Sequence, residues 1–326
     1  MSIMFMPLPY MPIWPNRLRS LTLFSCTSPL EYIVDFLSHA PRLRSLDIIG
    51  LVQDFAVSVD DFKWAPGSVR LPSLRWLSGF HPWPAAFIHA FLSMLVLPKK
   101  TKVLIYAGLG ERGRAPFNTL LPADFPPLQD LRRLELIGLP ESRLALHVYQ
   151  TVKACEYPSV KVLAETSGVF REAEGVSCEW SFPTDQVQEV VLCDVLPAEQ
   201  VRRRSKRQLV MGDDDWRAFL RRLPALKGVR LMSLSENTLA SFGRVLQADP
   251  TLCPKLVRVE VFDNCQGEGN GLWASLKESL SARSPEAGTG GRLMTVKFVD
   301  VLEKNWTAKQ LRARASKFAE VERTSI

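Results

Sequence analysis

NRLRSLTLFSCTSPLEYIVDFLSHAPRLRSLDIIG, residues 16–50, is the stretch that decides the fold. It contains the pattern L-x-x-L-x-L twice, once at Leu18, Leu21 and Leu23 and again from Leu43. In each copy apolar residues alternate with polar ones, which predicts a strand with one buried side and one side in solvent. The stretch therefore begins and ends with the same kind of strand.

The segment between the two strands predicts an amphipathic helix. Ser28 and Glu31 have the spacing of a capping box, and Pro29 occupies the first helical position, where a missing N–H costs little. Apolar residues follow the helical period from 30 to 37, and Pro41 ends the helix. Neither a strand nor a helix of this kind buries its apolar side alone, so such units must stack around a shared core.

The same frame recurs along the chain about every 31 residues, slightly longer than the usual leucine-rich repeat. Between the frames, apolar residues at the helical spacing form stripes that predict further helices at 87–95, 144–152, 213–223, 235–246 and 272–280. We place ten frames, whose first residues are Leu18, Leu43, Leu74, Thr101, Leu131, Val160, Val187, Leu226, Leu256 and Leu293.

The predicted fold class is α/β, a leucine-spaced repeat solenoid (a horseshoe) of about ten strand–helix repeats with a parallel concave sheet. A (β/α) barrel or a doubly wound sheet also alternates strands and helices. Strands of those folds are covered on both faces and are apolar throughout. Here LRRLEL at 131–136 and LVRVEV at 256–261 carry charges at alternate positions, so one strand face meets solvent and the horseshoe is favoured.

The chain divides into three parts. Residues 1–15 form an apolar leader to which the sequence assigns no role; its prolines and its lack of a basic start distinguish it from a signal peptide. The repeat domain covers 16–302 and contains an irregular insertion near 168–183. Residues 303–326 are expected to form a charged C-terminal capping helix and tail, which would protect the open end of the array.

Composition indicates a folded intracellular protein. The 326 residues are 46% hydrophobic with a net charge of +7, which permits a large core and a modest attraction to acidic partners. The six cysteines form no C-x-x-C pair and several lie in apolar segments, so we expect reduced, buried thiols. No apolar run reaches the length of a membrane span. We therefore expect a cytoplasmic or nuclear location without membrane contact.

The sequence contains no motif of an enzyme or a metal site. The four histidines are scattered without the spacing of zinc ligands, and neither a G-x-S-x-G motif nor a Walker A loop occurs. GEGNG at 267–271 follows a predicted strand, but its last glycine is misplaced for a dinucleotide-binding turn, and it fits a flexible loop better. The sequence thus predicts no catalytic residue, no metal and no cofactor.

A basic run lies in the longest interval between frames, at Arg202, Arg203, Arg204, Lys206 and Arg207. Its composition suits a nuclear-localisation signal, a patch for an acidic surface or an ordinary solvated loop. RNA-binding segments interleave aromatic residues with cations, and this run has none, so the sequence disfavours nucleic acid as a partner.

The solvent-facing side of the predicted strands is the candidate binding surface. Parallel strands of a solenoid present one wide face, and aromatic residues with arginine are typical of binding hot spots. Scattered exposed apolar residues are also ordinary. The residues predicted on this face are Thr22, Phe24, Asp47, Trp76, Phe80, Arg133, Glu135, Arg230, Arg258, Glu260, Phe262 and Lys297.

These frames resemble the leucine-rich repeat family. The uneven, proline-led copies PRLRSL, PSLRWL, PALKGV and PKLVRV are similar to the arrays of F-box proteins, fungal members in particular. The family's Asn or Cys landmark is matched by Cys26 and Asn264, whereas other repeats carry apolar residues or proline there.

In that family an F-box docks the Skp adaptor of a cullin ubiquitin ligase, and the repeats hold the substrate. The first frame here starts at Leu18, which leaves no room for an F-box. The resemblance therefore implies a protein substrate or regulator on the concave face, and a Skp-type adaptor only if an F-box lies upstream.

A second hypothesis is a horseshoe that regulates a GTPase. In such a protein a loop arginine enters the nucleotide site of its partner, and Arg112 and Arg114 in GLGERGR are the candidates. No acid–base or nucleophile constellation accompanies them. The sequence therefore favours non-enzymatic recognition of a protein.

Overall fold

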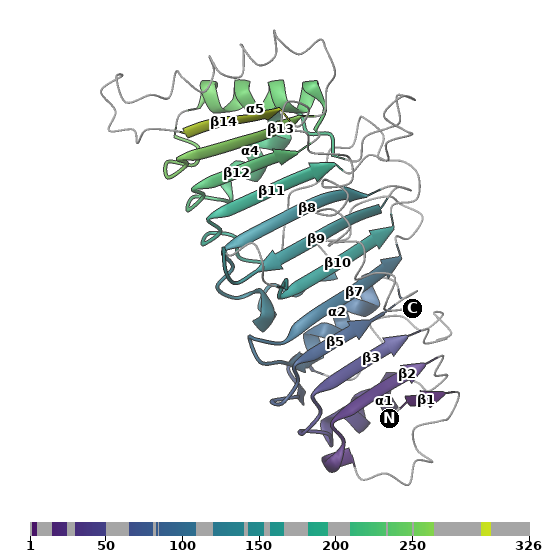
Figure 1. Cartoon of the computed structure of the whole chain (residues 1–326). Coiled ribbons are helices and arrows are strands. Elements are labelled where there is room, and N and C mark those ends of the chain that lie inside the picture. The colour runs from purple at the N-terminus through teal and green to yellow at the C-terminus, as the bar shows by residue number, and fades with distance from the viewer. Residues whose placement is uncertain are drawn as a thin grey trace.

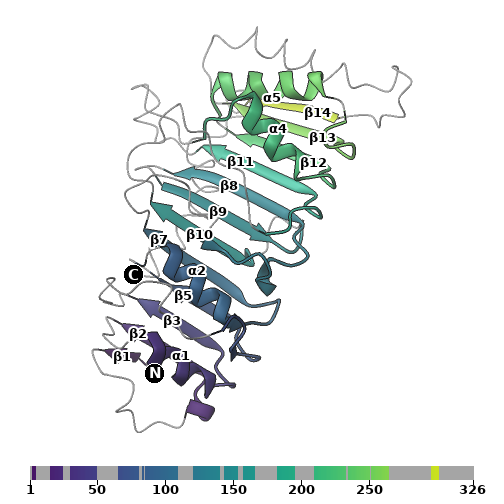
Figure 2. The ribbon, with the colours of Figure 1, turned by 180° about the vertical axis from the view of Figure 1, so that it is seen from behind.

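One large open sheet organises the chain in the computed structural model, and the described helices lie on one of its faces (Figures 1 and 2). Its twelve strands, in order across the sheet, are β1 (Ser2–Met4), β2 (Ser20–Phe24), β3 (Ser45–Ile49), β5 (Trp76–Gly79), β7 (Lys102–Gly108), β10 (Val160–Glu165), β9 (Arg143–Tyr149), β8 (Arg133–Leu139), β11 (Glu189–Asp194), β12 (Gly228–Met232), β13 (Arg258–Asp263) and β14 (Thr295–Asp300). The two edges are different strands, so the sheet does not close into a barrel. The protein is thus a mixed α/β protein with a large, mostly parallel sheet.

The structure describes residues 2–4, 15–24, 30–49, 65–80, 83, 85–108, 120–139, 143–152, 157–165, 182–194, 209–232, 234–249, 251–263 and 295–300.

Each of the ten predicted frames contains a strand, which begins at most two residues after the first residue of the frame. In seven frames that first residue donates its backbone N–H to the carbonyl three residues earlier, as Leu43 does to Ala40 at 3.1 Å. We call this feature the start turn. Proline occupies its second position at 41, 72, 224 and 254, where the fixed φ of the ring suits a type I turn. The proline-led frames are therefore explained by the geometry of the turn.

The centre of the sheet departs from a simple succession of repeats. β9 is antiparallel to both β8 and β10, so these three strands form a meander. The meander lies between β7 and β11, and the order across the sheet is β7-β10-β9-β8-β11. β10 pairs with β7 and β8 pairs with β11, in both cases in parallel. The expectation of a wholly parallel sheet is therefore wrong at β9.

Four of the predicted helical stripes coincide with helices of the described chain: α1 (Leu30–Ser38), α2 (Ala85–Met94), α4 (Asp213–Arg221) and α5 (Glu236–Ala248). The helix predicted at 144–152 is wrong, because this segment contains β9. Leu144 and Val148 are four residues apart, a spacing that suits one face of a helix and also one face of a strand. The helices predicted at 272–280 and within 303–326, and most of the insertion near 168–183, lie outside the described residues.

Part of the predicted leader belongs to the sheet. β1 pairs in parallel with β2, with Ser2 opposite Thr22 and Met4 opposite Phe24. The strand of the first frame is therefore not the edge of the sheet. A short edge strand of this kind limits the length of unpaired backbone that could join another chain.

The core lies between the sheet and the helices. Strand residues alternate, so that Leu21 and Leu23 of β2 are fully buried while Thr22 points the other way and is half-buried. One continuous cluster of buried apolar side chains extends from β2 to Val261 of β13. The stacked units therefore share one interior.

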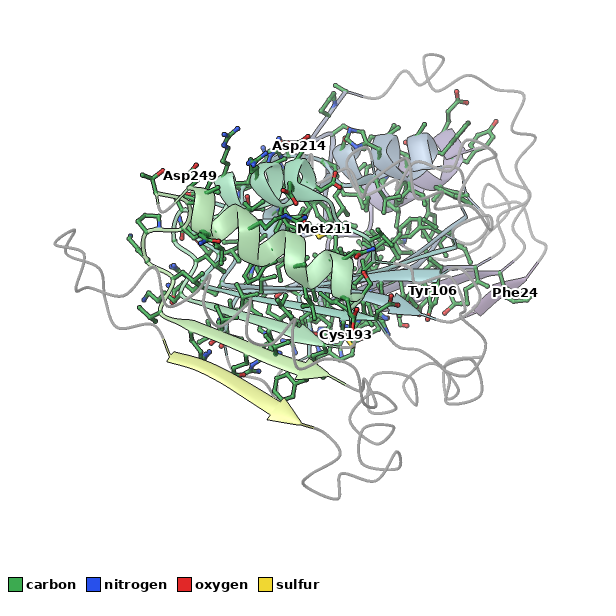
Figure 3. All side chains as sticks on the ribbon, turned by 90° about the horizontal axis from the view of Figure 1, so that it is seen from above. Phe24, Tyr106, Cys193, Met211, Asp214 and Asp249 are labelled. Carbon is green, nitrogen blue, oxygen red and sulfur yellow. The ribbon has the colours of Figure 1, made fainter. Side chains whose placement is uncertain are left out.

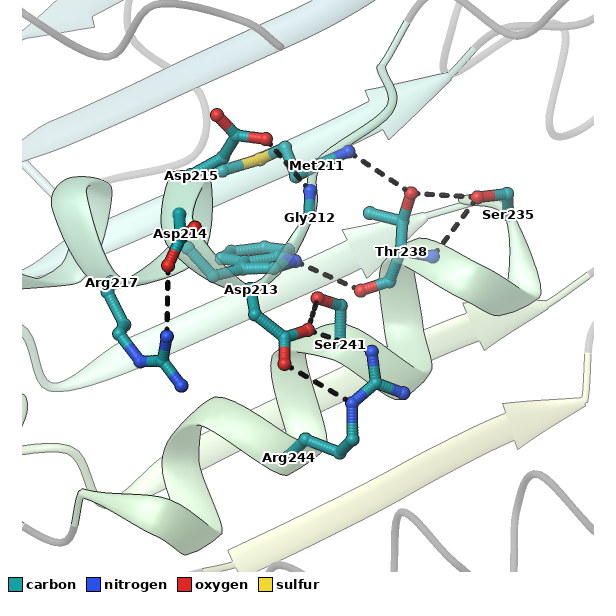
Figure 4. Close-up of polar contacts among 11 residues, drawn as sticks. Met211, Gly212, Asp213, Asp214, Asp215, Arg217, Ser235, Thr238, Ser241 and Arg244 are labelled. Carbon is teal, nitrogen blue, oxygen red and sulfur yellow. Dashed lines mark hydrogen bonds and ion pairs between the residues drawn. The ribbon is translucent and has the colours of Figure 1, made fainter. Parts of the chain in front are cut away.

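Polar contacts join α4 to α5 across the top of this core (Figure 4). The indole Nε1 of Trp216 donates to the carbonyl of Thr238 at 3.0 Å, and Arg244 forms an ion pair with Asp213 at 2.8 Å. Ser235 caps α5 by accepting the N–H of Thr238 at 3.2 Å. These contacts fix the two helices relative to each other.

A sharp corner ends β5. Gly79 and Phe80 both have positive φ, at 119° and 78°, and this turns the Phe80 ring into the core against Trp83 and Phe91. A Cβ on Gly79 would lie 1.9 Å from the carbonyl oxygen of Ile48 on the neighbouring strand. Only glycine fits this position.

We predict that Gly79→Ala destabilises the protein strongly, by more than the roughly 1–3 kcal/mol of backbone strain alone, because the new methyl group collides with backbone atoms. Gly67→Ala is the matched control: Gly67 also has positive φ (72°), but its Cβ would meet only a Val96 methyl group at 3.5 Å. Urea unfolding of both variants measures the difference. Equal losses of stability would contradict this account of the corner.

Candidate functional site

The candidate site is the face of the sheet opposite α1, α2, α4 and α5, which we call the open face. No described helix lies on this face, and the view from above shows α4 and α5 together on the other side (Figure 3). The pairing register aligns outward-pointing residues of neighbouring strands in rows. The middle row consists of Thr22, Asp47, Ser78, Leu104, Lys161, His147, Glu135, Val191, Arg230, Glu260 and Lys297.

Eleven of the twelve predicted binding residues occupy open-face positions of the strands. The exception is Phe80, which is fully buried in the core because the corner after β5 breaks the alternation. Lys297 is opposite Glu260 in the register, but its side chain is outside the described part of the structure. The remaining ten differ in exposure. Thr22 and Phe262 are half-buried, and the other eight separate into three regions of the open face.

The central region is a buried polar cluster on β8 and β9, formed by Arg133, Glu135, His147 and Tyr149. Glu135 accepts a hydrogen bond from the Tyr149 hydroxyl at 2.8 Å and forms an ion pair with Arg133. The Nδ1 atom of His147 lies 3.4 Å from Glu135 Oε2, the same oxygen that accepts from Tyr149, whereas Arg133 contacts Oε1. The Arg133 guanidinium also lies over the Tyr149 ring, 5.3 Å from its centroid.

The cluster changes the proton affinities of its members. Burial by itself raises the pKa of Glu135, but the contacts with His147, Arg133 and Tyr149 outweigh it, and the pKa falls below its usual value. The pKa of Tyr149 is raised, first by burial and then by the negative charge of Glu135. Glu135 is therefore a carboxylate at neutral pH, and Tyr149 keeps its proton.

Arg133 and Glu135 were expected to face solvent, and this expectation is wrong. Both side chains are at most 6% exposed, and each is the charge partner of the other. His147 and Tyr149 were not predicted, because their segment was expected to be a helix. The alternation of Leu144, Leu146 and Val148 with smaller or more polar residues was the signal for a strand.

The second region is a ladder of ion pairs on β11, β12 and β13. Arg230 Nε lies 2.6 Å from Glu260, and Arg258 forms an ion pair with Glu189. Arg258 reaches Glu189 by passing over Gly228, where a Cβ would lie 3.1 Å from the guanidinium. These four side chains are partly exposed, between 15% and 38%, so they form a charged and accessible surface.

The third region is apolar and lies on β2, β3 and β5. Phe24 and Ile49 are opposite each other in the register and are 37% and 42% exposed. Trp76 is half-buried and packs against the ring of Tyr157, with centroids 5.5 Å apart. Asp47, also half-buried, accepts a hydrogen bond from Ser78 beside them. Ile49 was not predicted, although it occupies the same position relative to its frame as Phe24 does.

The basic run at 202–207, and Arg112 and Arg114, lie outside the described residues. Within the described part of the chain, no group of histidine, cysteine and acidic residues could hold a metal ion. No helix in that part is long and apolar enough to span a bilayer.

Comparisons with known proteins give no relative for this chain: no family model, no curated protein and no solved structure matches it.

We predict that Glu135→Gln lowers the free energy of unfolding by about 3 kcal/mol, because it leaves the buried Arg133 charge without a partner. Two Arg133 nitrogens, Nε and Nη1, already donate to no acceptor in the described structure. Adding Arg133→Met to Glu135→Gln should therefore restore part of the loss. Chemical denaturation of the single and double variants measures this, and a double variant less stable than Glu135→Gln would contradict it.

The lowered pKa of Glu135 also predicts a pH dependence. Its contribution to stability is fully present above the unfolded value of 4.5 and is lost as the pH falls through the lower folded pKa. The difference in stability between the natural protein and Glu135→Gln should therefore shrink below pH 4.5. Urea titrations at a series of acidic pH values test this; a difference that widens on acidification would refute it.

Proposed function

We propose that this chain is a leucine-rich repeat solenoid that recognises a protein partner on the open face of its sheet, without catalysis. Support for the repeat comes from the ten frames that contain strands, the seven start turns and the one-sided helices. The proline at the second position of four start turns supports kinship with F-box-type arrays. Under this proposal the meander at β8 to β10 is an interruption of the solenoid.

The observation that carries the binding role is the pair of accessible regions on the open face. Phe24 and Ile49 are apolar side chains on neighbouring strands that stay exposed although the same strands contribute to the core, and the half-buried Trp76 lies at the other end of β5. Exposed aromatic groups on a rigid sheet lose little conformational freedom when they are covered by a partner. The apolar region therefore supports affinity.

The ion-pair ladder supports specificity. Arg230, Arg258, Glu189 and Glu260 alternate in sign within a small area, and a partner must complement that order or leave a charge unpaired. The central cluster of Arg133 and Glu135 has no such role, since both side chains are buried. We infer a partner that combines an apolar contact with charges of both signs.

The proposal includes a reducing compartment, cytoplasmic or nuclear, and a ubiquitin-ligase role only for a form that carries an upstream F-box. Cys193 is a free thiol, which agrees with such a compartment. The chain is proposed to bind a Skp-type adaptor only through such an F-box. The protein it binds on the open face would be a substrate or a regulator.

We predict that Trp76→Ala and Arg258→Ala each weaken partner binding about tenfold, since each removes a hot-spot type of side chain from one accessible region. Tyr32→Ala is the matched control, because Tyr32 is an exposed aromatic residue (49%) on α1, away from the open face. The partner is first captured by cross-linking from the open face, and its affinity for each variant is then measured by calorimetry. Unchanged affinity for both open-face variants, or a loss with Tyr32→Ala alone, would contradict the proposal.

A further inference from the structure

A second charged surface lies at the edge of the sheet where the parallel strands begin, which we call the start edge. At β2, β3 and β5 the residue just before the strand is Arg19, Arg44 or Arg75. The backbone N–H of Arg44 donates to the carbonyl of Arg19 at 2.7 Å, and that of Arg75 donates to Arg44 at 2.8 Å. These arginines therefore follow one another at the spacing of neighbouring strands, about 4.8 Å.

The cations of the start edge are exposed, and no carboxylate of the described residues pairs with them. Arg19, Arg44 and Arg75 are all exposed, and neighbouring positions of the start turns add further exposed cations. None of the set forms an ion pair with a carboxylate of the described chain; the set is Arg17, Arg19, Arg42, Arg44, Arg75 and Lys100. Like charges this close repel one another, and a bound anion would relieve that repulsion.

Three of these cations surround one hollow. The hollow has a volume of about 360 Å³ and lies between the start turn of β5 and the turn that precedes β7. Arg44, Arg75 and Lys100 line it together with Ser73, and prolines at 72 and 98 form part of its wall. The two turns are held by hydrogen bonds, so the hollow is a fixed feature with cationic and hydroxyl donors around it.

The corresponding hollow at the other end of the sheet has a different charge balance. It lies between the start turns of β12 and β13 and is lined by Arg221, Asp249, Thr251 and neighbouring apolar residues. Asp249 supplies a carboxylate there; its pKa is lowered, first by donation from Thr251 and also by the charge of Arg221. The hollow between β12 and β13 is thus lined by a carboxylate of the chain itself. The hollow between β5 and β7 has no carboxylate among its described lining residues.

We propose that the start edge of β2, β3 and β5 binds an acidic segment of a partner protein, with a carboxylate in the hollow formed by Arg44, Arg75 and Lys100. Nucleic acid is the weaker candidate, because single strands bind by stacking bases on aromatic side chains. Trp76, which directly follows Arg75, is half-buried and its ring already packs against Tyr157. The exposed aromatic residues of the described chain, Phe24 and Tyr32, lie at the opposite end of β2 and on α1. This binding is separate from the open face and does not depend on it.

The test is fluorescence anisotropy of the full chain with a labelled oligoglutamate peptide. We expect binding that weakens with added salt and falls about tenfold in the variant Arg44→Ala/Arg75→Ala/Lys100→Ala, because three exposed charge contacts are lost. A matched control, Arg203→Ala/Arg204→Ala/Arg207→Ala, removes the same three charges from the basic run and should change the affinity less than about twofold. Arg221→Ala should leave binding unchanged, since its hollow already holds a carboxylate.

Two outcomes would overturn the proposal. The first is an equal or larger loss in the basic-run control, which would assign the binding to overall charge. The second is tighter binding of a single-stranded oligonucleotide than of oligoglutamate at the same salt concentration. Circular dichroism of each variant verifies folding, and Arg75→Gln alone, a single exposed substitution, should still weaken peptide binding measurably.

Discussion

The structure depends on the alignment of its strands at one edge. Before five of the strands (β2, β3, β8, β11 and β12), a single carbonyl accepts two consecutive N–H groups from the neighbouring strand: Arg19 accepts from Arg44 at 2.7 Å and Ser45 at 3.1 Å, and Lys227 does the same for Val257 and Arg258. This contact recurs on both sides of the meander and sets the register. Because a slip of one residue would exchange the two faces of a strand, the register also decides which side chains enter the core.

Both surfaces proposed for binding follow from that register. The open face is the set of positions that alternate with the buried leucines, and the start edge is the set of positions where the shared carbonyls lie. The buried cluster of Arg133, Glu135, His147 and Tyr149 lies between the two accessible regions of the open face. It stabilises the antiparallel β8–β9 pair, where the repeat is interrupted, and separates an apolar region from a charged one.

Local patterns in the sequence predicted the strands well. The pattern L-x-x-L-x-L shows the two-residue period of a strand, and its first residue is the one that closes the start turn. The order of strands could not be predicted in the same way. Nothing local in VKVLAE at 160–165 indicates that this strand pairs with β7 and not with β8, since that choice depends on how long connections cross the sheet. β9 was mistaken for a helix because a four-residue spacing suits both structures.

The candidate site was predictable in position and less so in exposure. Alternation placed eleven residues on the open face, but it could not show that Arg133 and Glu135 are buried, because burial of that face depends on tertiary contacts. Phe80 was wrongly predicted on the open face, because Gly79 and Phe80 leave the extended conformation at the corner after β5. A glycine at the end of a strand pattern is the one local signal that pointed to such a corner.

The most direct test of this account is a cross-link that reports the register. Asp47 and Ser78 are opposite each other on the open face of β3 and β5, and their side chains are in contact. In the double variant Asp47→Cys/Ser78→Cys, oxidation should give a disulfide that mass spectrometry of the linked peptides detects. A disulfide that forms instead in Asp47→Cys/Leu77→Cys, whose second position belongs to the core face, would contradict the register and both binding surfaces derived from it.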